Sequence, residues 1–136
     1  MNTDSASSKA VAIAIQHVEA FSNHDYDTAR SLLADDVHFI LSTSVSMPGF
    51  PNPIEGNGVE AFMKALTSGN ALIIPGSLQV IHSIGDEHQA FITVSVKGTL
   101  PTQEPITLLA ARHYLLDEHE KITNELVIIA NYEGKV

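Results

Sequence analysis

The chain has 136 residues, of which 44% are hydrophobic, and it contains no cysteine, so disulfides and thiolate chemistry are excluded. A chain of this length can bury about two thirds of its unfolded surface as one domain, and we expect a single domain over residues 1–136 with a disordered tail at residues 1–8. Sixteen acidic residues against seven Lys and Arg give a formal charge of −9. This charge argues against nucleic acid or an anionic membrane as a partner, because both need clustered cations.

The N-terminal region carries no pattern typical of a membrane anchor or a secretory signal. The apolar run at residues 10–15 is too short to span a bilayer. The residues before it include Asp4 and a single lysine, unlike the basic start of a signal peptide. We therefore expect a cytoplasmic protein that does not use a membrane.

The first part of the chain predicts two helices and a strand. Val18 and Phe21 belong to the apolar stripe of a first helix, which ends in the turn at residues 23–25. A second helical period restarts at Ala29 and is expected to stop at residues 35–36. Residues 37–41 then have the character of a strand.

The rest of the chain predicts a loop, a third helix and four strands. Residues 47–53 hold three prolines and one glycine, which indicates a loop or lid. Helical spacing returns at residues 58–66 and stops at residues 68–70. Strand patterns follow, with a hairpin turn at residues 85–87 between the first two, and they cover residues 78–84, 90–96, 106–116 and 122–130. This order predicts an α+β fold with a curved mixed sheet around helices.

Three segments of the chain resemble the nuclear transport factor 2-like superfamily, in particular ketosteroid isomerase and the SnoaL-like polyketide cyclases. They are QHVEAFSNHDYDTARSLLADDVHF at residues 16–39, GNGVEAFMKAL at residues 56–66 and ARHYLLDEHEKI at residues 111–122. The resemblance covers roughly residues 10–131. It implies a cystatin-like α+β barrel, a cone-shaped sheet wrapped around three helices from the N-terminal half, with a pocket at its mouth.

The resemblance also indicates what has changed in the pocket. In ketosteroid isomerase an aspartate moves a proton, while a tyrosine and a protonated aspartate stabilise the enolate oxygen. Matching the shared segments places the tyrosine on His17, the base on Leu41 and the protonated acid on Arg112. Leu41 cannot take a proton, so steroid isomerisation by that route is disfavoured. The same matching predicts an apolar wall and a hydrophobic ligand, with the wall formed by Phe62, Val94, Val96, Val127 and Ile129.

Arg112 and Glu125 are the first pair of candidate site residues. If Leu116 faces Lys121 across the loop between the last two strands, Arg112 lies directly opposite Glu125, on the same sheet face as Tyr114. Arg112 could then hold a ligand carboxylate or a developing oxyanion, with Glu125 as its orienting partner or as a base. The alternative is an ion pair that neutralises itself within the sheet.

His17 is the other candidate. It lies one turn after Ile13 and one turn before Phe21, so it projects from an apolar helix face. An imidazole there could act as a general base or donate to a ligand oxygen. The alternative is a buried histidine with a satisfied hydrogen bond.

The remaining motifs predict no metal and no cofactor. The other histidines lack the close spacing of zinc ligands, and the chain has neither a phosphate-binding loop nor a dinucleotide-binding turn. His113 projects from the opposite face of the sheet. This second apolar face predicts a homodimer, and it carries Leu109, His113, Leu115 and Leu126.

These patterns support two functional hypotheses. The first is a cofactor-independent acid/base enzyme that isomerises, cyclises, dehydrates or hydrolyses a small hydrophobic carbonyl or carboxylate compound. His17 or Glu125 would be its base, and Arg112 would hold the anion. The second is a non-catalytic domain that binds a ligand or serves as a dimerising accessory module. A transport factor for protein partners has less support, because only the sheet face offers a surface for one.

Overall fold

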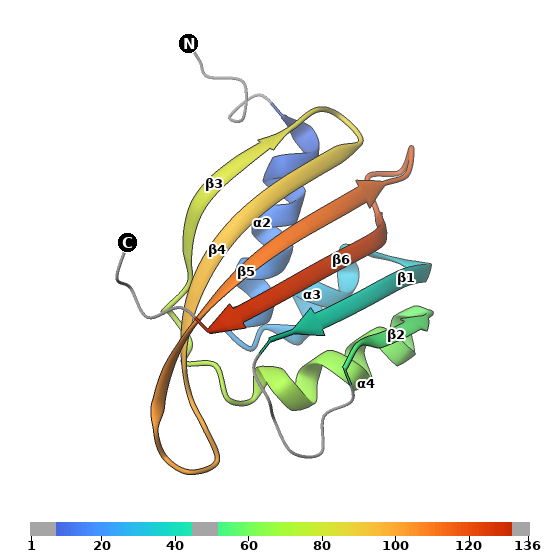
Figure 1. The fold of residues 1–136 in the computed structure, drawn as a ribbon. Helices are drawn as coiled ribbons and strands as arrows, with labels where there is room; N and C mark the ends of the chain where they lie inside the picture. The colour runs from blue at the N-terminus through green and yellow to red at the C-terminus, as the bar shows by residue number, and fades with distance from the viewer. Residues whose placement is uncertain (1–7, 45–51, 132–136) are drawn as a thin grey trace.

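The computed structural model describes residues 8–44 and 52–131, and three helices pack against one face of a single curved sheet (Figure 1). The helices are α2 (Lys9–Ser22), α3 (Tyr26–Ser31) and α4 (Val59–Asn70). The strands are β1 (Leu33–Thr43), β2 (Ile54–Asn57), β3 (Gln79–Gly85), β4 (Gln89–Thr99), β5 (Pro105–Leu116) and β6 (Ile122–Asn131). Their order in the sheet is β2-β1-β6-β5-β4-β3. The predicted α+β fold with a curved mixed sheet is confirmed, since β1 and β6 are parallel and the other neighbours are antiparallel.

Helix α2 lies against β3, β4 and β5, while α4 covers β1 and β2. The Ser8 side chain caps α2 by accepting a hydrogen bond from the Val11 amide at 3.1 Å. Buried side chains recur along α2 every three or four residues, as expected for a helix with one face on a sheet. They include Ala10, Val11, Ala14, His17, Val18 and Phe21.

Helix α3 ends at Ser31, earlier than the predicted stop at residues 35–36. Leu33 instead begins β1 and pairs with Ile122 of β6 in the parallel ladder. The Ile122 amide donates to the Leu32 carbonyl at 2.9 Å. Because Leu33 is buried by this pairing, the long-range contact overrides the local helical spacing.

Strand β2 was not predicted by the sequence pattern. It pairs with β1 in antiparallel fashion, and Gly56 lies opposite Phe39. A Cβ atom at Gly56 would lie 2.9 Å from Cζ of the Phe39 ring, so the glycine allows this close approach. The loop or lid predicted at residues 47–53 falls largely outside the described residues.

The β5–β6 ladder corrects the predicted register. Tyr114 lies opposite Glu125, and Arg112 lies opposite Val127. The connecting loop is one residue longer than the prediction assumed, and an irregularity between residues 115 and 116 adds a second residue. A shift of two residues keeps every side chain on its original face. Arg112, Tyr114 and Glu125 therefore still share one face of the sheet.

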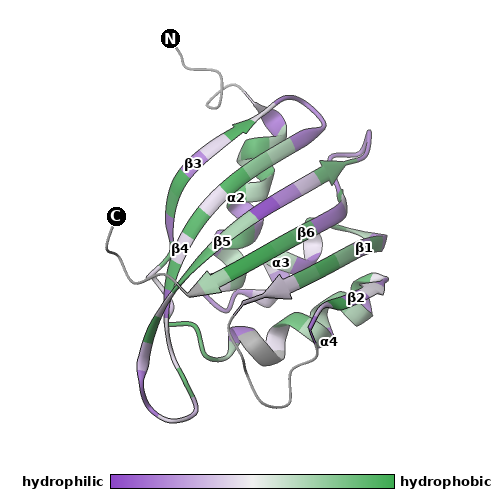
Figure 2. Cartoon of the chain, viewed as in Figure 1, coloured by the Kyte–Doolittle hydropathy of each residue, from purple (hydrophilic) through white to green (hydrophobic). Residues whose placement is uncertain are grey.

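Strand β6 is apolar over most of its length (Figure 2). The exposed large hydrophobic residues of the sheet include Phe91 of β4 and Leu126 and Ile128 of β6. His113 is a direct neighbour of Phe91 on β4 and of Leu126 on β6, not of residue 124 as the predicted register implied. Its ring stacks on Phe91 with centroids 4.4 Å apart. Phe91 is 48% exposed and Ile128 is 53% exposed. None of the helices in residues 8–44 and 52–131 is long and apolar enough to cross a membrane.

Candidate functional site

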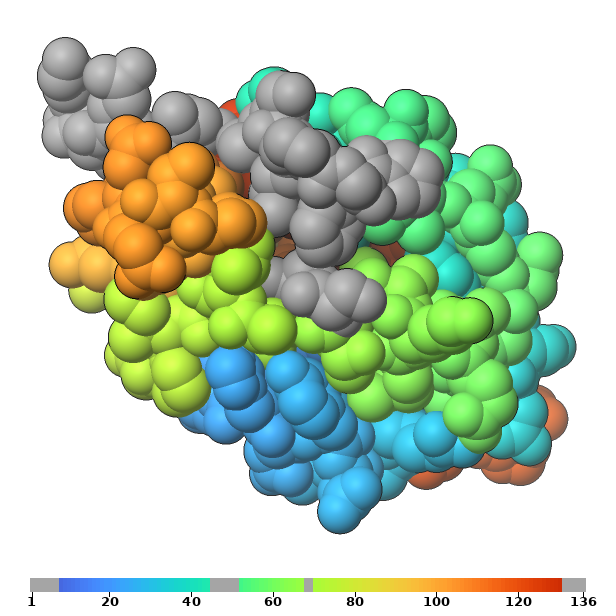
Figure 3. Space-filling view, turned by 90° about the horizontal axis from the view of Figure 1, so that it is seen from below, coloured from blue at the N-terminus to red at the C-terminus, as the bar shows by residue number. Residues whose placement is uncertain are grey.

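A partly open cavity of about 140 Å³ lies between the sheet and helices α2 and α4. Figure 3 looks at the end of the molecule where α4, the residues after it and the tip of the β4–β5 hairpin border a hollow. A cavity of about 150 Å³ holds a benzene molecule, so this one has room for a small ring. Most of the described lining is apolar, and its polar residues are His17, Ser22, Thr43, Asn70, Arg112 and Glu125.

The predicted wall residues, and with them Leu41 and Tyr114, which we also expected to contact a ligand, fall into two groups. Leu41, Val94, Val96 and Ile129 line the cavity. Phe62, Tyr114 and Val127 are fully buried and lie in the core beside it.

Sequence patterns missed part of the lining. Helix α4 contributes Ala65 and Leu66, and the segment after α4 contributes Leu72, Ile73 and Leu78. The helical spacing of α4 could have indicated Leu66. Residues 72–78 carry no periodicity, so no signal pointed to them.

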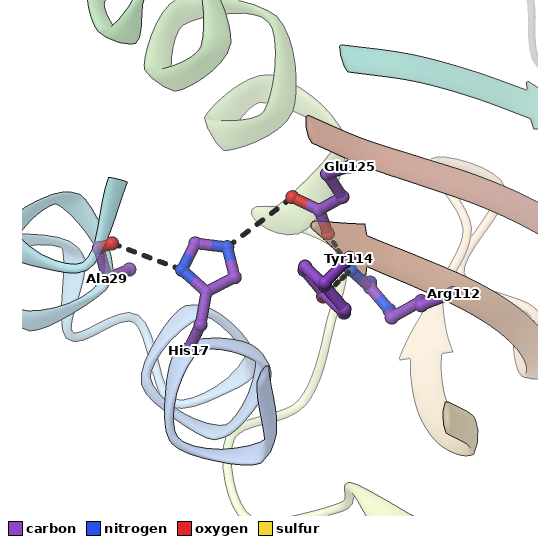
Figure 4. A network of polar contacts seen from close by, with 5 residues as sticks. All are labelled: His17, Ala29, Arg112, Tyr114 and Glu125. Carbon is purple, nitrogen blue, oxygen red and sulfur yellow. Dashed lines mark hydrogen bonds and ion pairs between the residues drawn. The ribbon is translucent and has the colours of Figure 1, made fainter. Parts of the chain in front are cut away.

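At the inner end of the cavity, His17, Arg112 and Glu125 come together from α2, β5 and β6 (Figure 4). Nη1 of Arg112 donates to Oε2 of Glu125 at 2.7 Å and to the Tyr114 hydroxyl at 3.1 Å. Oε1 of Glu125 lies 3.5 Å from Nε2 of His17. The side chains of His17 and Glu125 are 1% and 0% exposed, so the cluster is shielded from bulk water.

The fold holds the His17 ring in one orientation. Aromatic rings surround it, with the centroids of Phe21 and Phe62 both at 5.7 Å and that of Tyr114 at 5.9 Å. Nδ1 of His17 lies 3.1 Å from the Ala29 carbonyl oxygen in α3. A carbonyl oxygen only accepts hydrogen bonds, so Nδ1 carries a proton and donates it. Nε2 is therefore the ring nitrogen that can gain or lose a proton.

The neighbours of Glu125 favour its ionised form. Burial raises the pKa of its carboxyl, but the interactions with His17 and Arg112 outweigh burial, and the pKa lies below its usual value of 4.5. Burial lowers the pKa of Arg112, but the interactions with Tyr114 and Glu125 outweigh this and raise it. Burial raises the pKa of Tyr114 well above its usual range, so Tyr114 keeps its proton.

Three buried polar atoms of the cluster have no hydrogen-bond partner among the described residues. They are Nε2 of His17, Nε of Arg112 and Oε1 of Glu125. Buried polar atoms are normally paired, and exceptions often mark a functional site. The unpaired atoms lie at the polar end of an apolar cavity, which is the arrangement expected for a small ligand with one polar group. Among residues 8–44 and 52–131, no group of three or more His, Asp or Glu side chains is placed to hold a metal ion.

Comparisons with solved structures find the same fold in proteins of low sequence identity. IdmH from Streptomyces antibioticus, named as a candidate polyketide cyclase, is 16% identical with a TM-score of 0.69, and the match covers 88% of this chain and 91% of that chain. A candidate isomerase from Rhodopseudomonas palustris is 13% identical with a TM-score of 0.68, covering 95% and 91%. A protein with a ketosteroid isomerase-like fold from Catenulispora acidiphila, solved with trimethylamine, is 14% identical with a TM-score of 0.66, covering 85% and 82%.

The sequence itself matches one family over most of its length. No curated protein matches the chain significantly. The sequence profile of the SnoaL-like domain matches residues 14–125, a span that includes His17, Arg112 and Glu125. The predicted resemblance is thereby confirmed, and the chain belongs to the SnoaL-like domain family.

Proposed function

We propose that the protein is a cofactor-independent acid/base enzyme that acts on a small hydrophobic compound bearing a carbonyl or carboxylate. The observation that carries this proposal is the polar cluster of His17, Arg112 and Glu125, with three unpaired buried atoms, at one end of a mostly apolar cavity. Two proteins of the same fold are named as a candidate cyclase and a candidate isomerase. Many reactions of both kinds move a proton between the carbon next to a carbonyl group and an acid/base group of the enzyme.

His17 is the acid/base group in this proposal. Its Nδ1 is held by the Ala29 carbonyl, so proton transfer takes place only at Nε2. A positioned general base contributes about 10²- to 10⁴-fold to a rate. The interactions of Glu125 with His17 and Arg112 lower its pKa, which makes it a poor base, and its carboxylate stabilises the protonated ring of His17.

Arg112 holds the negative charge that develops on the ligand oxygen. Its side chain lines the cavity and is 19% exposed, while its hydrogen bonds to Tyr114 and Glu125 both use Nη1. A guanidinium in a site shielded from water stabilises an oxyanion more strongly than it would in bulk water.

We also propose that two copies of the chain associate through the outer sheet face. The aligned side chains of Phe91, His113 and Leu126, together with Ile128 beside them, form an apolar surface of the kind that proteins bury against a partner. Leu109 and Leu115 of β5 are less exposed neighbours of this surface. A non-catalytic binding domain could dimerise in the same way, so dimerisation does not distinguish the two functions.

The test of the enzyme proposal is deuterium exchange at the carbon next to a ketone. Phenylacetone and phenylpyruvate are incubated in D2O with the protein, and proton NMR measures the exchange rate relative to buffer alone. The protein is expected to accelerate exchange of at least one compound. His17→Gln should lower the acceleration by about a hundredfold, while His119→Gln, which changes a histidine that is 78% exposed, should not.

The NMR spectra of the same samples also distinguish a non-catalytic binding protein from an enzyme. If the NMR signals of both compounds shift on binding but exchange stays at the buffer rate, the protein is a carrier and the enzyme proposal is wrong. If exchange is accelerated equally by the wild type and by His17→Gln, the protein is an enzyme but His17 is not its acid/base group.

A further inference from the structure

We infer that the buried cluster carries one net positive charge at rest and therefore selects an anionic ligand, a small carboxylate with an apolar body. The inference rests on the proposed function, because it names the charge of the ligand that the same site takes. It is carried by the hydrogen-bond geometry of His17, Arg112 and Glu125 and by the absence of another charge in the described lining of the cavity.

His17 and Glu125 hold one proton between them. Nδ1 of His17 already donates to the Ala29 carbonyl. If His17 were neutral and Glu125 ionised, the lone pair of Nε2 would face the lone pairs of Oε1 at 3.5 Å with no hydrogen between them. Two buried acceptors facing each other repel and are left unsatisfied. One proton therefore resides on this pair, either on Nε2 or on Oε1.

With this proton, the cluster of His17, Arg112 and Glu125 carries one net positive charge. With the proton on Nε2, the cluster contains two cations and one anion. With the proton on Oε1, His17 and Glu125 are both neutral and Arg112 remains charged. Either position leaves one net positive charge, so the conclusion does not depend on where the proton resides.

The described surroundings of the cluster do not neutralise this charge. Among the described residues that line the cavity, His17, Arg112 and Glu125 are the ionisable ones. Tyr114 faces the cluster from β5 and stays neutral, because burial raises its pKa. The positive charge is therefore uncompensated within the cavity, although the chain as a whole carries a formal charge of −9. A buried charge without a counter-charge is unfavourable, so a ligand anion is favoured there.

The free edge of the Arg112 guanidinium suits a carboxylate. The hydrogen bonds that Arg112 makes to Glu125 and Tyr114 both use Nη1, and Nε has no partner among the described residues. Nε and Nη2 lie on the same edge of the group, and this edge can bind two carboxylate oxygens through parallel hydrogen bonds. The apolar body of the ligand would lie against Leu41, Val94 and Ile129.

The test compares three probes that share a ring and differ in charge: benzoate, benzamide and benzylamine. Titration calorimetry at neutral pH gives the affinity of the wild-type protein for each. Benzoate is expected to bind about tenfold or more tightly than benzamide, because hydrogen bonds between charged groups are roughly twice as strong as neutral ones. Benzylamine is expected to bind most weakly. Equal affinities for benzoate and benzamide, or a preference for benzylamine, would overturn the inference.

Variants test whether the preference follows the net charge. His17→Gln leaves Arg112 and Glu125 as a neutral pair, so the preference for benzoate should fall to about threefold or less. Glu125→Gln leaves Arg112 charged and should keep the preference. In the double variant His17→Gln/Glu125→Gln the net charge is again positive, and the preference should return. Loss of the preference in the double variant contradicts the charge argument.

The outcomes also separate the two proposals. Preferred binding of benzoate without any deuterium exchange refutes only the enzyme, whereas exchange of phenylacetone without a preference for benzoate refutes only the charge selection.

Discussion

Replacing Glu125 with alanine should destabilise the protein more than replacing an exposed carboxylate with alanine does. The change removes a carboxylate that is 0% exposed and leaves Arg112, whose side chain is 19% exposed, and His17, which is 1% exposed, without an anion between them. Removing one partner of a buried ion pair costs about 3–5 kcal/mol. Solvent reaches part of Arg112, so we expect about 3 kcal/mol, a large share of the roughly 5–15 kcal/mol that stabilises a typical domain. The midpoint of thermal unfolding should fall by about 10 °C.

The assay is urea unfolding followed by circular dichroism at neutral pH. Glu60→Ala is the matched control, because Glu60 also pairs with an arginine, Arg30, but its side chain is 76% exposed. A surface pair of this kind contributes about 0–1 kcal/mol. If Glu125→Ala lowers the free energy of unfolding no more than Glu60→Ala does, the buried network does not stabilise the fold.

Three further predictions test the site and the outer face. The pKa of Glu125 is lower in the folded protein than its usual 4.5, so its contribution to stability is present above that value and is lost as the pH falls through the folded pKa. In urea unfolding, Glu125→Gln should therefore lose less stability in acid than the wild type does, and parallel pH profiles of the two proteins would refute this prediction. Ala65→Phe should fill the cavity and weaken benzoate binding about tenfold or more, and unchanged affinity by calorimetry would show that the ligand binds elsewhere. Phe91→Asp should convert a dimer into a monomer in light scattering, and equal masses for wild type and variant would count against the proposed interface.

Most of the fold could be predicted from local patterns. The stripe of Val18 and Phe21 indicated α2, and residues 85–87 indicated the β3–β4 hairpin, in which Gly85 pairs with Ala90. The errors arose where distant contacts decide the structure. Leu33 joins β1 because Ile122 pairs with it, and no local pattern records that pairing.

The candidate site was predictable only in part, because it depends on how separate elements pack. The spacing of α2 placed His17 on an inward face, and strand alternation placed Arg112 and Glu125 on one face despite a register error of two residues. The approach of His17 to Glu125, and the orientation of its ring by Ala29, depend on how α2 and α3 lie across the sheet. Sequence spacing does not contain that information.

Nitrogen-15 NMR of the His17 ring in the free protein tests the central claim most directly, because it reports which ring nitrogens carry protons. The geometry predicts a proton on Nδ1, held by the Ala29 carbonyl, with the exchangeable proton at Nε2. The Nε2 signal should respond to Glu125→Gln and to added benzoate. A neutral ring with its only proton on Nε2, and with no response to benzoate, would contradict both the acid/base role of His17 and the positive charge of the cluster.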